Sequence, residues 1–108
     1  MSDYFFIQSQ DPYTEARVGH QYQLACQLAS AGHNVTLLLV QNGVTPARLD
    51  ARSAPFEELL ASKVRVVADA FSMQQRELDE DTLKDAVRIG DVSDAIDAML
   101  AGHKVIWN

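Results

Sequence analysis

Short apolar runs alternate with longer amphipathic segments along this chain. Five runs of mostly apolar, β-branched or aromatic residues predict strands. They occupy residues 4–7, 35–40, 64–67, 87–89 and 104–107. The second run is almost continuously apolar, which is typical of a strand covered on both of its faces.

The segments between the runs predict helices. Val18, Tyr22, Ala25 and Ala29 recur at spacings of 4, 3 and 4, which places them on one face of a helix over residues 15–31. Thr14 is the expected N-cap of this helix, and Gly32 is the expected left-handed residue that ends it. Further helical segments are expected at residues 46–49, 54–61, 71–77, 81–86 and 92–101, with Pro46 as the first helical residue of its turn and a tight turn at residues 41–43.

Strands that alternate with helices predict an α/β fold, because parallel strands need a crossover helix to return the chain. We therefore expect a single domain over residues 1–108, with a parallel sheet and helices on both of its faces. The pattern A-G-H-x-V occurs twice, at residues 31–35 and 101–105. We interpret it as two helix-to-strand loops of the same geometry.

Composition narrows the class of protein. The 108 residues include 9 Lys and Arg against 15 Asp and Glu, a formal charge of 9 − 15 = −6, and 47% are hydrophobic. This acidic balance disfavours nucleic acid and an anionic membrane as partners, since both require clustered cations. No apolar run is long enough to span a bilayer and no secretory signal is visible, so we expect a cytoplasmic protein.

Standard catalytic and cofactor motifs are missing from the sequence. There is no glycine-rich dinucleotide loop, no P-loop and no G-x-S-x-G elbow, so no cofactor is predicted. The three histidines, His20, His33 and His103, are scattered and predict no metal site. One cysteine, Cys26, excludes both an internal disulfide and a metal cage built from several thiolates.

Polar residues follow the predicted strands, at the edge where open parallel sheets bind ligands. These candidate ligand-binding residues are Gln8, Asn42, Gly43, Asp69, Ser72 and Arg76. They fit a small ligand or the tail of a partner protein, and Gly43 allows a close approach of the backbone. The alternative interpretation is that they form turns and cap helices.

Cys26 also has two interpretations. It lies in the middle of the first predicted helix, at the edge of the apolar stripe, where a cysteine is ordinarily a small buried hydrophobic residue. A reactive thiol is favoured by a helix N-terminus or by neighbouring cations, and the sequence places neither beside Cys26.

Several segments together resemble the DsrE/DsrF-like family of small sulfur-relay proteins. The resemblance rests on Phe5–Ile7, Leu28–His33, the strand and turn Val35–Val44, the segment Val66–Ser72 with Gln75 and Arg76, and Gly102–Trp107. It implies a three-layer α/β/α fold with a five-stranded parallel sheet, a cytoplasmic location and assembly into homo- or hetero-oligomers. Active members carry a persulfide sulfur on one cysteine and pass it to a partner protein.

The chain departs from this pattern at the position that matters most for the chemistry. In the DsrE and TusD branches the cysteine follows the third strand, whereas this chain has Ala68-Asp69-Ala70 there. Glu77 stands near the place where the family has a glycine after its arginine. In the DsrH branch a cysteine lies on the first helix, and Cys26, six residues before Gly32, is the comparable residue.

Three functions therefore remain open. The first is sulfur relay, either with Cys26 as a catalytic thiol or as a non-catalytic partner of a sulfur-carrier protein. The second is a cysteine-independent module that binds a small ligand or a protein, and a third alternative is an enzyme that uses Asp69 as an acid or base. A homo-oligomer is expected in each case, with Val92, Ile96 and Met99 beside Trp107 as exposed apolar residues.

Overall fold

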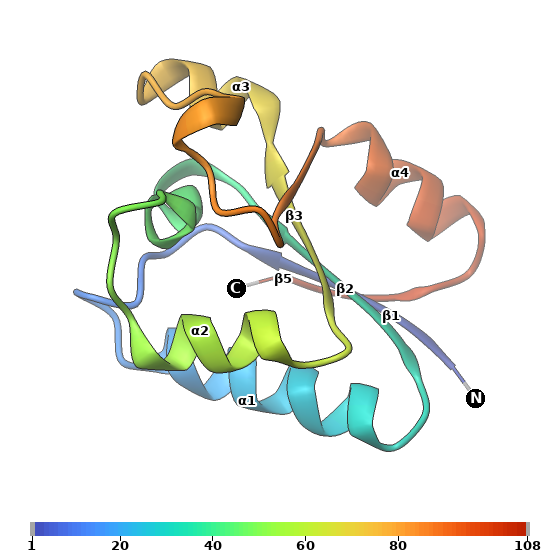
Figure 1. The fold of residues 1–108 in the computed structure, drawn as a ribbon. Coiled ribbons are helices and arrows are strands. Elements are labelled where there is room, and N and C mark those ends of the chain that lie inside the picture. The colour runs from blue at the N-terminus through green and yellow to red at the C-terminus, as the bar shows by residue number, and fades with distance from the viewer. Residues whose placement is uncertain (1, 108) are drawn as a thin grey trace.

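A computed structural model describes residues 2–107 and shows one sheet with helices around it (Figure 1). The strands are β1 (Asp3–Gln8), β2 (Asn34–Leu39), β3 (Arg65–Asp69), β4 (Arg88–Gly90) and β5 (Lys104–Trp107). The α-helices are α1 (Arg17–Ser30), α2 (Ala54–Ala61), α3 (Ala70–Gln75) and α4 (Ser93–Leu100), and the 3-10 helices are η1 (Gln41–Ala47) and η2 (Glu80–Thr82).

All five strands are parallel, in the order β4-β3-β2-β1-β5. The predicted α/β fold with a five-stranded parallel sheet is therefore confirmed. The first strand lies inside the sheet, next to the edge strand β5, because Phe6 lies opposite Leu37 of β2 on one side and Ile106 of β5 on the other. The last strand forms one edge of the sheet, and β4 forms the other.

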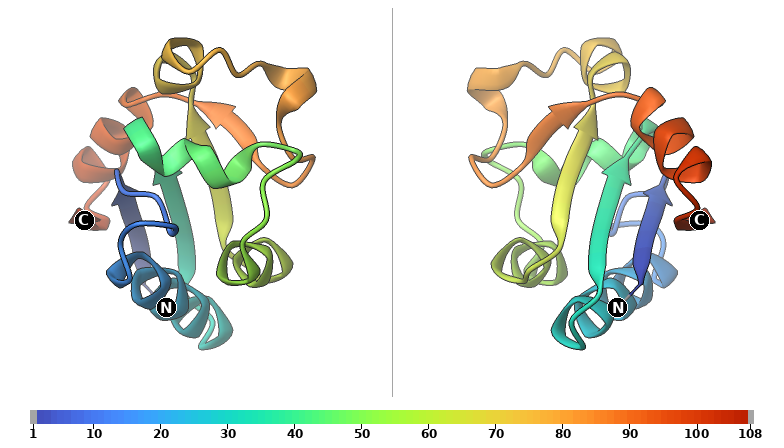
Figure 2. Two further views of the ribbon diagram at one scale, coloured as in Figure 1. Left: turned by 90° about the vertical axis from the view of Figure 1, so that its left-hand side faces the viewer. Right: turned by 90° about the vertical axis from the view of Figure 1, so that its right-hand side faces the viewer.

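The helices make two further layers (Figure 2). On one face α1 and α2 cover the sheet, and Phe6, Leu37 and Leu39 pack there in a core that includes Tyr22 and Phe56. On the other face Phe5, Ile7, Leu38 and Val67 pack against Ala95 and Ala98 of α4. Alternate residues of the same strand point into different cores, which is why the runs in β1 and β2 are almost continuously apolar.

The two A-G-H-x-V segments do form equivalent loops. Gly32 and Gly102 follow the ends of α1 and α4 with φ of +95° and +83°, the left-handed region that glycine enters without a Cβ penalty. The next residue in each loop closes the helix end in the same way. His33 N–H donates to the carbonyl of Leu28 at 3.2 Å, and His103 N–H donates to that of Ala98 at 3.0 Å.

Two local predictions near the ends of β1 and β2 are wrong. Thr14 does not cap α1: its N–H and hydroxyl both donate to Asp11, and the N-cap is Ala16. Residues 41–43 are not an isolated turn but the start of η1, which contains Pro46 in its interior. The helical turn expected over residues 46–49 is wrong as well, because η1 ends at Ala47 and Arg48 is extended. Pro46 has no N–H and so removes one hydrogen bond from this short 3-10 helix.

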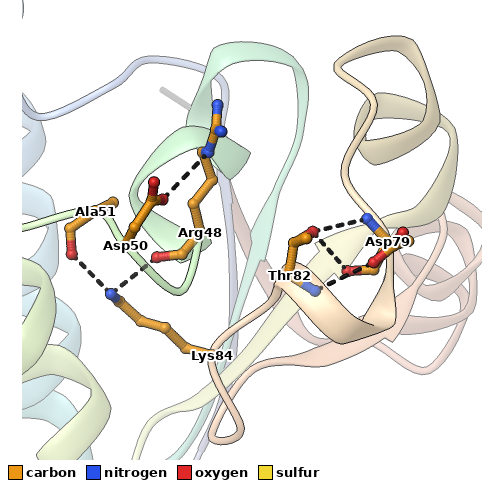
Figure 3. A network of polar contacts seen from close by, with 6 residues as sticks. All are labelled: Arg48, Asp50, Ala51, Asp79, Thr82 and Lys84. Atoms are coloured by element: carbon orange, nitrogen blue, oxygen red, sulfur yellow. Dashed lines mark hydrogen bonds and ion pairs between the residues drawn. The ribbon is translucent and has the colours of Figure 1, made fainter.

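The predicted helix over residues 81–86 is also wrong. Only η2 forms there, and the chain then pairs with the segment after η1 through an antiparallel bridge between Arg48 and Leu83. Leu49 N–H donates to the carbonyl of Thr82 at 2.7 Å, and Lys84 N–H donates to that of Ala47 at 2.9 Å. Asp79 caps η2 in a reciprocal capping box with Thr82 (Figure 3).

Lys84 explains why an extended conformation is favoured at this point. Its ammonium group donates to the carbonyls of Arg48 at 2.9 Å and Ala51 at 2.8 Å, as Figure 3 shows, and lies 3.2 Å from Glu57. Only 11% of its side chain is exposed, so the charge is neutralised in a largely dry position. Lys84 thus fixes the loop between η1 and α2, a tertiary contact that local sequence patterns do not encode.

Gly43 provides a test of how closely η1 packs against the end of β1. A Cβ at this position would lie 2.2 Å from the backbone oxygen of Gln8, so Gly43→Ala must shift backbone and should destabilise the protein by about 1–3 kcal/mol in urea unfolding. Gly19 of α1 is the matched control, because nothing lies within 4 Å of its Cβ position. Gly19→Ala should stabilise the helix by about 0.5–1 kcal/mol, and equal effects of both variants would contradict the close approach.

Candidate functional site

Asp69 lies where β3 ends and α3 begins, and its side chain is only 3% exposed. One carboxylate oxygen, Oδ2, accepts hydrogen bonds from the backbone N–H of Ser72 at 2.9 Å and from its hydroxyl at 2.7 Å. Asp69 is therefore the N-cap of α3, and its charge is directed at the orphan N–H groups of the first turn.

Ser72 connects α3 to η1. Its buried hydroxyl donates to Asp69 and at the same time accepts from the backbone N–H of Gln41 at 2.8 Å. Gln41 has φ of +51°, a left-handed conformation that costs free energy in a residue other than glycine. The hydrogen bond to Ser72 stabilises that conformation at the first residue of η1.

Arg76 completes the connection from the C-terminal end of α3. Its Nη1 donates to the carbonyl of Ser72 at 3.2 Å and its Nη2 donates to Oδ1 of Asn42 at 3.0 Å. We call Asn42, Asp69, Ser72 and Arg76 the carboxyl-edge brace. The sequence placed these four residues together, and the structure joins them by hydrogen bonds.

The end of α3 departs from the sequence prediction. The helix was expected to continue through Glu77, but it ends at Gln75, and Glu77 takes φ of +56°. This is the backbone region that favours glycine, and Glu77 is also the residue that stands near the glycine of the resembled family. The chain thus makes a left-handed turn after Arg76 with a residue other than glycine.

Gln8 and Gly43 lie beside the brace. The Gln8 side chain is fully buried, donates through Nε2 to Oε1 of Gln21 and accepts at Oε1 from the N–H of Gln10 at 2.9 Å. Its backbone oxygen accepts from Val40 N–H at 3.0 Å and is the atom that excludes a Cβ at Gly43. The close approach expected of Gly43 is therefore made to the protein's own backbone.

Two buried donors on α1 were not predicted. Nε2 of Gln21 and the hydroxyl of Tyr22 are buried and have no hydrogen-bond partner among residues 2–107. Burial, and then the proximity of Tyr13 and Asp11, raises the pKa of Tyr22, so the hydroxyl stays protonated. Sequence spacing could have identified Gln21, since it lies three residues after Val18 and four before Ala25, on the buried stripe.

The chemistry that the carboxyl-edge brace can perform depends on which of its polar groups already make hydrogen bonds. The brace holds one carboxylate and one hydroxyl, and neither an imidazole nor a thiol belongs to it. Oδ2 of Asp69 accepts two hydrogen bonds. The Ser72 hydroxyl donates to that carboxylate and accepts from the N–H of Gln41. The brace orders the loops at the carboxyl edge and contains no activated nucleophile.

Cys26 lies apart from the brace, on α1. It is half-buried, packs against the core between the sheet and α1, and lines a cavity of about 390 Å³ between α1 and α2. The other residues lining this cavity are Gly19, His20, Tyr22, Gln23, Pro55, Glu58 and Ser62. They include a carboxylate but no lysine or arginine, so the surroundings supply no fixed cation to stabilise a thiolate.

Two further features are missing from the described part of the chain. Across residues 2–107, no three side chains of His, Cys, Asp or Glu are placed to hold a metal ion. None of the helices there has the length and apolar character needed to cross a membrane. His33 and His103 lie just before β2 and β5, at the opposite edge of the sheet from the brace.

Solved structures share this fold. The ychN protein from E. coli matches with a TM-score of 0.86 and 20% sequence identity, and each chain covers 100% of the other. MTH1491 from Methanobacterium thermoautotrophicum, a protein of unknown function, matches with a TM-score of 0.81 and 20% identity over 99% of this chain and 98% of that one. No curated protein matches the sequence.

The family assignment rests on the sequence as well as on the fold. A family model matches residues 2–107, which include every strand and helix described above. The three-layer arrangement and the order of the strands agree with that match. The chain belongs to the DsrE/DsrF-like family.

Proposed function

We propose that this chain takes part in cytoplasmic sulfur metabolism as a non-catalytic partner in sulfur relay, in contact with a sulfur-carrier protein. The observation that carries the proposal is the position of Asp69. The resemblance implies a cysteine after the third strand in the DsrE and TusD branches, and this chain has Asp69 in that stretch, buried and used to cap α3. Relay of a sulfane sulfur requires a thiolate that can form a new sulfur–sulfur bond, and a carboxylate does not form one.

The retained scaffold supports a role in recognition. The brace fixes η1 and α3 side by side at the carboxyl edge, where the guanidinium of Arg76 is held by Ser72 and Asn42. Phe71 is 65% exposed in the first turn of α3. An ordered edge with an exposed aromatic side chain is suited to a protein contact, because ordering costs little further entropy on binding.

Cys26 supports a second candidate, direct sulfur relay. Cys26 is half-buried and lines the cavity between α1 and α2, so a small donor can reach it. In that reaction the Cys26 thiolate attacks the outer sulfur of a donor persulfide. A new sulfur–sulfur bond forms, the bond within the donor breaks, and the donor leaves as a thiolate without net oxidation or reduction. This candidate stands second because no lysine or arginine lines the cavity beside Cys26 to stabilise its thiolate.

The apolar surface of α4 and β5 supports a homo-oligomer. Val92, Ile96, Met99 and Trp107 are each more than half exposed, and β5 is an edge strand. Grouped exposed apolar side chains next to a free strand edge are characteristic of a protein interface. The exposure expected of these four residues from the sequence is confirmed, and we propose that a second copy of the chain covers them.

The capping role of Asp69 can be tested by stability. Asp69→Ala leaves the Ser72 hydroxyl and N–H without their acceptor and should lower the free energy of unfolding by about 1–3 kcal/mol. Asp85→Ala is the control, because Asp85 is exposed, and its effect should stay within about 0.5 kcal/mol. A stable Asp69→Ala variant that loses a binding partner would assign Asp69 to recognition instead.

The two candidate functions are separated by persulfide loading followed by intact mass measurement. We expect native wild-type protein to retain no added sulfur, in agreement with the surroundings of Cys26. Unfolded wild-type protein is the control and should take up one sulfur on the same thiol. One sulfur on native wild type and none on Cys26→Ser would make direct relay the function.

The proposed oligomer can be measured by size-exclusion chromatography with light scattering at micromolar concentration. Wild type should elute as more than one chain, whereas Ile96→Asp should shift towards the monomer because it places a charge in the apolar surface. Leu24→Asp is a control on α1, where Leu24 is 43% exposed. A wild-type monomer, or equal behaviour of the two variants, would contradict an interface at α4.

A further inference from the structure

The amino edge of the sheet, opposite the carboxyl-edge brace, contains a cavity of about 490 Å³. It lies between the end of α1 and the beginnings of β1, β2 and β3. The side chains that carry the following argument are Asp3, Tyr4, His33, Lys63, Arg65 and His103, all of which line it. A volume of this size is within the range that holds a small metabolite.

The repeated A-G-H-x-V segments bring two imidazoles to this edge. One repeat precedes β2 and the other precedes β5, and these two strands flank β1. His33 and His103 therefore stand on either side of the first residues of β1. Two segments about seventy residues apart in the chain thus contribute equivalent residues to one cavity.

The charge of the cavity is opposite to that of the whole chain. Lys63 and Arg65 are exposed, and within residues 2–107 neither makes an ion pair. Asp3 is the one carboxylate among the lining residues, and it is already engaged. Its Oδ1 accepts from Asn34 Nδ2 at 2.9 Å, and its Oδ2 lies 3.8 Å from His103 Nε2. In a chain with a formal charge of −6, two unpaired cations at one cavity favour an anionic ligand.

His33 is held in position before any ligand binds. Its Nδ1 accepts from the N–H of Ser2 at 3.0 Å, which places the ring proton of the neutral imidazole on Nε2. The ring of Tyr4 packs edge-on against it with centroids 5.3 Å apart, and Lys104 lies 5.4 Å from the centre of that same tyrosine ring. The orientation of the His33 donor is therefore fixed by contacts that a ligand need not supply.

Three backbone carbonyls at the end of α1 already accept hydrogen bonds and do not face an anion as free acceptors. The carbonyls of Gln27, Leu28 and Ala29 accept from the N–H groups of Ala31, His33 and Gly32, respectively. The negative end of the helix is thus covered by the glycine loop that follows it.

We propose that this cavity binds a small molecule through a tetrahedral oxyanion, a phosphate or a sulfate group. Lys63 and Arg65 neutralise its charge, and Nε2 of His33 donates a hydrogen bond to it. Arginine and lysine make charge-assisted bonds to such oxygens, which are among the stronger polar contacts in proteins. This proposal is independent of the sulfur-relay proposal, because it uses neither Cys26 nor the carboxyl-edge brace.

The test is a titration of the full chain followed by NMR of its three histidine rings. Inorganic phosphate, inorganic sulfate and ribose 5-phosphate are the probes, with sodium chloride at matched ionic strength as the control for screening. We expect saturable shifts of the His33 and His103 rings and no shift of His20, which lies on α1 away from this edge. Tighter binding of ribose 5-phosphate would identify a phosphorylated metabolite as the ligand class, whereas equal binding would identify the free oxyanion.

Variants locate the site. The double substitution Lys63→Gln and Arg65→Gln should weaken phosphate binding by about tenfold or more, because two charge-assisted contacts are lost. Both residues are exposed, and Arg52→Gln is the matched control, an exposed arginine outside this cavity that should change the affinity by less than about twofold. Shifts that chloride reproduces, that do not saturate, or that persist in the double variant would mean an adventitious ion only, and the proposal would be wrong.

Discussion

The buried amide of Gln8 is the constraint on which the carboxyl edge of the sheet depends. A buried amide without partners costs about 1–3 kcal/mol, so the chain must bring partners to it. They come from the loop after β1, through Gln10, and from α1, through Gln21. The backbone oxygen of Gln8 also accepts from Val40, and the lack of a side chain at Gly43 lets η1 lie against it. Three segments are therefore positioned against one residue, and η1 then carries the residues that meet α3.

Much of this architecture could be predicted from the sequence because the apolar pattern is governed by burial on the two faces of the sheet. Most of β2 is buried, on both faces of the sheet, and its sequence from Val35 is apolar except at Thr36. The stripe through Val18 and Tyr22 identifies α1. Residues 81–86 were misassigned because their conformation is set by a distant partner. Arg48 pairs with Leu83, and Lys84 binds carbonyls more than thirty residues away, so no local pattern reports either contact.

The sequence predicts where the polar residues of the candidate site lie, but not whether they bind a ligand or one another. Topology brings strand ends together, so Asp69, Ser72 and Asn42 could be placed at one edge without knowledge of their contacts. Whether such polar residues face a ligand or one another depends on side-chain geometry. Here the hydroxyl of Ser72 donates its hydrogen bond to the carboxylate of Asp69. At the amino edge the residues were visible in the sequence, but the site that they form was not. The repeated histidines were visible in the sequence, but the cavity needs Lys63 and Arg65 from a third segment, and only the strand order brings that segment beside them.

The position of β5 has a consequence for how the chain acquires its structure. Residues 93–107 supply both α4, which covers Phe5 and Ile7, and the strand that pairs with β1 from one hundred residues away, as with Tyr4 and Lys104. Until these residues have left the ribosome, β1 is an unprotected edge and one face of the sheet is bare. The closing contacts are the most distant in sequence, and such contacts make folding slow. The growing chain therefore remains prone to aggregation until residues 93–107 have joined the sheet.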